Sequence, residues 1–185
     1  MNLLPLNQKV LDKFGPYTLI TGISLILLGT AGIFLPGVMS LSTAIFVGWL
    51  LLIAGGFWAI HTYQYSRKHV MDWIKPTLLI IIGGLMLFYP AKGVEVVGVL
   101  LATYLLLDAL GSFALAQTIH PAKGWGWMAF NGVISALLAI LFLAGWPSTS
   151  FWMVGLYVGI SLLFDGWALV VIGWKLRDEK NKSRL

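Results

Sequence analysis

The sequence contains no cysteine and has few charged residues. The absence of cysteine excludes disulfide bonds, thiolate metal sites and cysteine nucleophiles. Charged residues make up 10% of the 185 residues, whereas a soluble domain contains about a quarter. Hydrophobic residues reach 59%, and the mean hydropathy is +0.89. A domain of this size has no interior that could hold so many apolar side chains, so they must face lipid.

Patterns that carry catalysis are also missing. The sequence has no glycine-rich phosphate loop with a lysine, no Ser/His/Asp set and no pair of acids at catalytic spacing. His61, His69 and His120 match the spacing of no metal motif, and we expect them to be polar residues near the membrane surface. We therefore expect no enzyme, no cofactor and no metal site.

Long apolar runs fill nearly the whole chain. Six stretches are long enough to cross a bilayer as helices: 17–35, 38–63, 74–89, 93–119, 127–146 and 150–174. We predict one all-α membrane domain over residues 1–185, an integral membrane bundle of six transmembrane helices. Residues 1–16 precede the first span and favour either a short helix on the membrane surface or a frayed tail, and residues 175–185 form a basic tail.

The basic residues predict the orientation in the membrane. One side would hold both termini and the loops near 64–75 and 117–126, and the other side would hold only Lys92 among all Lys and Arg residues. The eleven basic residues on the first side are Lys9, Lys13, Arg67, Lys68, Lys75, Lys123, Lys175, Arg177, Lys180, Lys182 and Arg184. Basic residues collect on the cytoplasmic side, so both termini are expected there. The pI near 9.6 thus indicates contact with anionic lipid headgroups rather than with nucleic acid.

The strongest pattern is a threefold repeat anchored on Pro36, Pro90 and Pro147. Small residues recur 12, 19 and 26 positions after each proline, and we call these nine positions the small-residue stripe. They are Gly48, Gly55 and Thr62; Ala102, Ala109 and Ala116; and Gly159, Gly166 and Gly173. Small side chains let helices approach closely in lipid, where no hydrophobic effect draws them together. We predict three parallel hairpin repeats, at 17–63, 73–119 and 127–174.

Two acids occupy the same position of this repeat. Asp108 and Asp165 each stand 18 residues after their proline, where the first repeat has Ala54. Asp108 would lie about 13 Å from the cytoplasmic end of its helix, near the middle of the membrane. A carboxyl at that depth is costly, tends toward its neutral form and must point inward. Both acids are candidate sites for a proton or cation, or structural hydrogen-bond partners between helices; a backbone carbonyl or a hydroxyl would meet them, such as Ser24, Thr30, Thr103, Ser112, Ser135 or Ser161.

The repeats resemble a known family. The relevant segments are GISLILLGTAGIFLP with GWLLLIAGG, LLIIIGGLMLFYP with YLLLDALG, and GVISALLAILFLAGWP with ISLLFDGWAL. They are similar to the HdeD-like proteins of bacteria and archaea, which are built from short DUF308-type repeats. The resemblance covers about residues 17–175, and the chain departs from it at Ala54. It implies an inner-membrane protein associated with acid resistance or envelope stress, without an established enzymatic reaction.

Other functions stay open at this point. A small transporter or channel for protons, cations or a small solute would use Asp108 and Asp165, although the spans contain few polar residues. An assembly protein would use the basic cytoplasmic loops. Membrane lipids are the expected partners, and a homo-oligomer or another membrane protein is a further alternative.

The absence of cysteine makes the topology directly testable. Single cysteines introduced as Leu35→Cys, Lys92→Cys and Ser148→Cys should all react with a membrane-impermeant thiol reagent from the same, non-cytoplasmic side. Lys123→Cys should react only after the membrane is permeabilised. If the three positions near the prolines labelled from opposite sides, the threefold repeat would be wrong.

Overall fold

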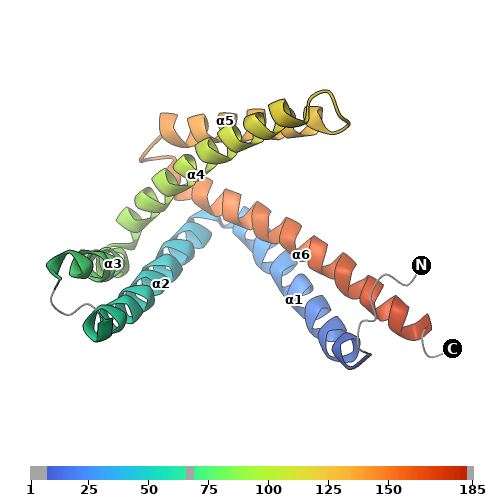
Figure 1. Ribbon diagram of the computed structural model, residues 1–185, viewed down its shortest axis with the longest axis horizontal. Helices are drawn as coiled ribbons and strands as arrows, with labels where there is room; N and C mark the ends of the chain where they lie inside the picture. The colour runs from blue at the N-terminus through green and yellow to red at the C-terminus, as the bar shows by residue number, and fades with distance from the viewer. Residues whose placement is uncertain (1–7, 66–68, 183–185) are drawn as a thin grey trace. The chain divides into compact units, whose positions relative to one another are not determined.

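The structure is a computed structural model that describes the backbone of residues 8–65 and 69–182, and the side chains of residues 17–65 and 69–177. This part of the chain contains six α-helices and no strand (Figure 1). The helices are α1 (Gln8–Phe34), α2 (Pro36–Tyr65), α3 (Val70–Phe88), α4 (Pro90–Ile119), α5 (Trp125–Ala144) and α6 (Ser150–Lys182). All six are long and apolar enough to cross a membrane. The predicted all-α membrane fold is therefore confirmed.

Proline and glycine determine several of the helix boundaries. Pro36 and Pro90 are the first residues of α2 and α4, and a single residue separates each from the preceding helix. Proline disfavours the helical conformation of the residue before it and needs no N–H partner in the first turn, so it ends one helix and begins the next. Gly124 precedes α5 with φ +110°, a conformation that only glycine adopts without strain.

The two terminal helices extend beyond the predicted spans. Helix α1 begins at Gln8, so residues 8–16 are helical and continuous with the first apolar span, Tyr17–Phe34. Helix α6 runs to Lys182, so most of the expected tail continues the last span as helix. The rest of the N-terminal segment, residues 1–7, and the end of the tail, residues 183–185, lie outside the described residues.

The chain forms two compact units. The first contains α1 and the part of α6 from Leu156 onward, which run antiparallel. A Cβ atom added at Gly22 would lie 2.9 Å from the carbonyl oxygen of Gly166, and one added at Gly29 would lie 2.6 Å from that of Gly159. Because these distances leave no room for a side chain, the backbones of α1 and α6 touch directly.

Within the second unit, residues 37–155, helices α2 and α3 pack in the same way. A Cβ atom at Gly83 would lie 2.8 Å from the carbonyl oxygen of Gly48. Pro76 lies inside α3 and has no N–H to donate to the carbonyl of Asp72, four residues earlier. The hydroxyl of Thr62 on α2 donates to that oxygen at 3.4 Å. Thr62 thus supplies a donor in place of the one that the proline removes.

Helices α4 and α5 form the third close pair. Their contact buries alanines instead of glycines: Ala102 on α4 and Ala139 on α5 are both 0% exposed. At Gly132 of α5, an added Cβ would lie 3.0 Å from the ring of Phe113 on α4. This pair therefore has methyl groups at stripe positions where the α1·α6 pair has glycine.

The close pairs join neighbouring repeats. Each return helix packs its small-residue stripe on the outgoing helix of the next repeat, α2 on α3 and α4 on α5, and the last return helix packs on the first helix, α6 on α1. The pairing is thus cyclic in chain order. The stripe glycines contact the partner helix in these interfaces. The remaining stripe residues, Thr62 and the three alanines, have buried side chains.

The first turns of α2, α4 and α6 meet inside the second unit. Gly37 of α2 lies against the ring of Phe151 of α6, Ala44 of α2 lies against Gly93 of α4, and Gly98 of α4 lies against Ser150 of α6. Glycine or alanine occurs on at least one side of every one of these contacts. The three return helices therefore contact one another at the ends where they begin.

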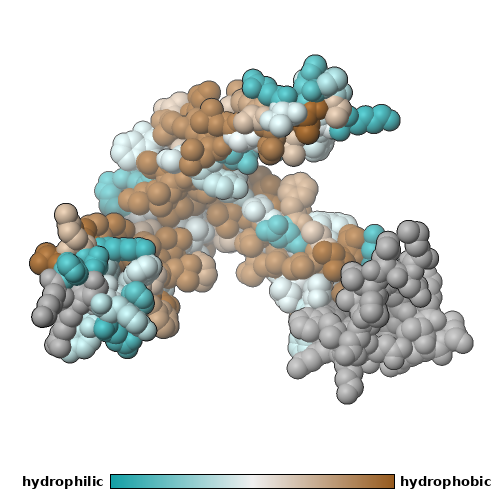
Figure 2. All heavy atoms as spheres, in the orientation of Figure 1, coloured by the Kyte–Doolittle hydropathy of each residue, from teal (hydrophilic) through white to brown (hydrophobic). Residues whose placement is uncertain are grey.

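Most large apolar side chains point away from these contacts. Leu27, Phe57 and Leu107 are more than 60% exposed. Figure 2 shows hydrophobic side chains along the helices, with hydrophilic ones gathered at the ends where α2 joins α3 and where α4 joins α5. This distribution suits helices whose middle parts face lipid.

Adjacent glycines in α3 test the backbone contacts. Gly83→Ala should destabilise the protein by about 1–2 kcal/mol, because the new methyl group would collide with the backbone of α2. Gly84→Ala should be neutral or slightly stabilising, because nothing lies within 4 Å of its Cβ position and alanine favours helix. Thermal unfolding in detergent measures both variants, and equal losses would contradict the tight α2·α3 contact.

Candidate functional site

Asp108 takes part in a polar contact between α4 and α5. Its Oδ2 atom accepts hydrogen bonds from the hydroxyl of Ser135 at 2.6 Å and from Nδ2 of Asn131 at 3.3 Å. The same Nδ2 atom donates to the hydroxyl of Ser112 at 2.9 Å. We call Asp108, Ser112, Asn131 and Ser135 the Asp108 cluster.

The cluster follows from helix geometry. Asp108 and Ser112 are four residues apart on α4, and Asn131 and Ser135 are four residues apart on α5, so each pair lies on one face of its helix. Ser112 and Ser135 are buried in the interface, Asp108 is half-buried and Asn131 is exposed. The cluster therefore begins inside the helix contact and opens at its edge.

One oxygen of the Asp108 carboxyl group, Oδ1, takes no part in the hydrogen bonds to α5. Both bonds from α5 end on Oδ2, and Oδ1 accepts none from the described residues. Helix α5 carries no charged side chain, so both donors are neutral. The arrangement can tie α4 to α5, and it leaves one carboxyl oxygen able to take a proton or a cation.

The other two helix pairs carry different contacts at the same positions of the repeat. Counting forward from the prolines aligns Ser112 with Trp58 and Leu169. On the outgoing helices, where the third repeat has one extra residue before its proline, alignment on Gly22, Pro76 and Gly132 matches Asn131 with Thr21 and Lys75. In the α2·α3 pair, Nζ of Lys75 lies 3.4 Å from the centroid of the Trp58 ring, a cation–π contact. At these positions of the repeat, the α4·α5 pair thus has a hydrogen bond and the α2·α3 pair has a cation–π contact.

Asp165 does not reproduce the contacts of Asp108. It is exposed on α6, and among the described residues it makes no hydrogen bond or ion pair. The residues of α1 that align with Ser135 and Asn131 are Leu25 and Thr21, and the hydroxyl of Thr21 donates to the carbonyl of Tyr17 on its own helix at 2.8 Å. The two acids therefore match in the repeat but differ in their surroundings, and they belong to different compact units.

The sequence identified part of the cluster. Among the hydroxyls proposed to meet the acids, that of Ser135 donates directly to Asp108, and that of Ser112 is linked to it through Asn131. The hydroxyls of Thr30 and Thr103 instead donate to carbonyls of their own helices. Asn131 was not among the predicted residues. Its place immediately before Gly132, in the interface, is the signal that would have revealed it.

The histidines lie near the ends of helices that face the predicted cytoplasm. His61 stacks on Tyr65 at 4.8 Å and meets the edge of Trp58 at 5.5 Å. His120 meets Trp125 with ring centroids 4.8 Å apart. Within the described ranges, no group of three His, Asp or Glu residues could hold a metal ion.

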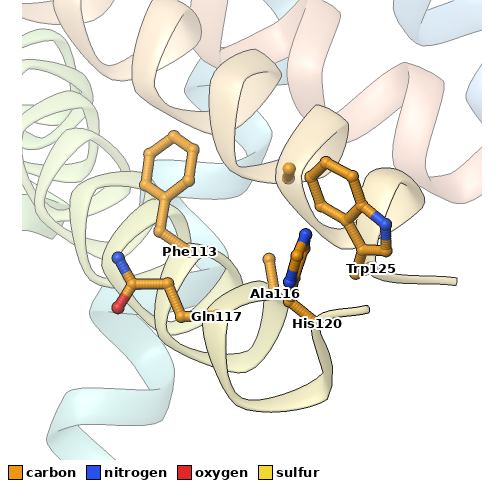
Figure 3. A pocket seen from close by; sticks show the side chains of 6 residues that line it. Phe113, Ala116, Gln117, His120 and Trp125 are labelled. Atoms are coloured by element: carbon orange, nitrogen blue, oxygen red, sulfur yellow. The ribbon is translucent and has the colours of Figure 1, made fainter. Parts of the chain in front are cut away.

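A pocket of about 430 Å³ lies at the end of the α4·α5 pair beside the loop 120–124 (Figure 3). Its walls come from the last turns of α4 and the first turns of α5. They are formed by Phe113, Ala116, Gln117, His120, Trp125 and Ala129. The pocket was not predicted from the sequence.

These features define a multi-pass membrane protein made of repeated helix pairs. A family model described as a short repeat of unknown function (DUF308) matches the chain three times, at residues 20–78, 74–144 and 141–185. The chain belongs to the DUF308 family. Comparisons with curated proteins and with solved structures found no match.

A double-mutant cycle tests the hydrogen bond between Asp108 and Ser135. Asp108→Ala, Ser135→Ala and the double variant should show a coupling of about 1 kcal/mol, the range measured for hydrogen bonds between membrane helices. Ala54 already occupies the position of Asp108 in the first repeat, so the substitution suits the fold. Asp165→Ala combined with Ser135→Ala is the control and should show no coupling. Additive effects of Asp108→Ala and Ser135→Ala on unfolding would contradict the bond.

Proposed function

We propose that the chain is a multi-pass protein of the plasma membrane of a prokaryote, with both termini in the cytoplasm, that contributes to acid resistance or to the response to envelope stress and catalyses no reaction. Membership of the DUF308 family and the resemblance to HdeD-like proteins support this proposal. The structural observation that carries it is the half-buried carboxyl of Asp108, held by two donors from the neighbouring helix.

Protonation gives this site a physical link to acid. The carboxyl accepts two hydrogen bonds from α5, and in its ionised form these bonds would be roughly twice as strong as bonds between neutral groups. A proton on Asp108 removes that charge and weakens the contact between α4 and α5. The other charged or titratable side chains of α4 are Lys92, Glu95 and Tyr104, and Lys92 and Glu95 pair with each other near its first turns. Helix α5 carries no charged side chain, so Asp108 is the one acidic member of the cluster and has no counter-ion on α5.

Transport of protons or cations is the second candidate function. It is favoured by the free Oδ1 atom of Asp108 and by Asp165, which has no hydrogen-bond partner among the described residues. Transport predicts a flux of protons or cations across proteoliposomes that Asp108→Asn abolishes. If the protein acts in stress resistance without transport, the proton or cation flux across proteoliposomes should equal that across liposomes without protein.

Survival at low pH tests the main proposal. In cells that depend on this protein, Asp108→Asn together with Asp165→Asn should lower survival toward that of cells lacking the protein, because asparagine keeps the shape but cannot release or take up a proton. Asp72→Asn, at the start of α3, is the matched control and should survive as the wild type does. Unchanged survival of the double variant at normal protein levels would remove both acids from the mechanism.

A further inference from the structure

The pocket between α4 and α5 exists because one position of the repeat carries an unusually small residue. Ala129 stands three residues before Gly132, as Leu19 stands three before Gly22 and Trp73 stands three before Pro76. In the α6·α1 pair, the Cγ atom of Leu19 lies 2.8 Å from the Cβ position of Gly173, which aligns with Ala116. A large side chain thus fills this space in that pair, whereas α4·α5 leaves it open.

The walls of the pocket combine apolar and polar groups. Phe113, Ala116, Ala129 and Trp125 supply apolar surface, and Gln117 and His120 supply an amide and an imidazole (Figure 3). The ring of Phe113 also lies against Gly132, and the pocket shares no lining residue with the Asp108 cluster. The volume of about 430 Å³ lies in the range of small-molecule sites.

The position of the pocket and the basic residue of the adjoining loop indicate the kind of molecule that reaches it. It lies at the end of a membrane-crossing pair, where Trp127 is 76% exposed, as tryptophans at a membrane surface are. The adjoining loop 120–124 carries His120 and Lys123 and no acid. A ligand with an apolar body and an anionic head matches both the walls and the loop.

We propose that this pocket is a specific site for one anionic phospholipid of the cytoplasmic leaflet. The glycerol and upper acyl chain lie against Phe113, Ala129 and Trp125, and the phosphate lies on the side of His120 and Lys123. The site is separate from the Asp108 cluster, and the proposal does not depend on a role in acid resistance.

Native mass spectrometry of the full chain in detergent tests this site. The probes are phosphatidylglycerol, phosphatidylcholine and inorganic phosphate, each titrated separately. Phosphatidylglycerol should give one tightly bound lipid per chain, and Lys123→Gln should weaken its binding about fivefold, the effect of one basic residue at a membrane surface. Phosphatidylcholine should bind more weakly, and inorganic phosphate should neither bind nor displace the lipid.

Substitutions taken from the other repeats fill the pocket. Ala129→Leu and Ala129→Trp introduce the residue types that α1 and α3 carry at this position, so the helix pair should still fold. Both should abolish the single tight site. Val133→Trp adds the same bulk to an exposed position of α5 and should leave lipid binding unchanged. Undiminished phosphatidylglycerol binding by both Ala129 variants, equal binding of phosphatidylcholine, or displacement of the lipid by inorganic phosphate would overturn the proposal.

Discussion

The fold depends on direct contact between helix backbones. Lipid chains are as apolar as leucine side chains, so burying leucine between helices gains little, and close packing must supply the attraction. Glycine permits that packing at Gly22 with Gly166, at Gly29 with Gly159 and at Gly48 with Gly83. Because the small residues recur every seven positions, they stay on one face of the helix and keep the two backbones close over several turns.

The three helix pairs share this geometry but differ in chemistry. The α1·α6 pair relies on glycine contacts, and the α2·α3 pair adds a cation–π contact and the bond from Thr62 to the carbonyl freed by Pro76. The α4·α5 pair, with alanines in its stripe, carries the Asp108 cluster and the pocket beside Ala129. The pair whose stripe consists of alanines is thus the one that holds the polar cluster and the pocket.

The sequence predicted the elements well and their partners less well. Apolar runs and prolines located all six helices, because helix length and breaking are local properties. The small-residue stripe predicted close packing but not the partner helix. The partner depends on how distant parts of the chain come together, as when α6 packs on α1. The repeat identified Asp108, but Asn131 and Ala129 gain their roles from residues on the facing helix. Asp165 shows the limit of this reasoning. It occupies the same position of the repeat as Asp108, but the facing helix does not offer it the same hydrogen-bond donors.

The pairing of α6 with α1 has a consequence for biosynthesis. Helices α2 and α4 meet their partners as soon as the following helix enters the membrane, but four helices are synthesised between α1 and its partner α6. While those four helices are inserted, the glycine face of α1 has no partner helix to pack against. The close packing of α1 can therefore form only after α6 has entered the membrane.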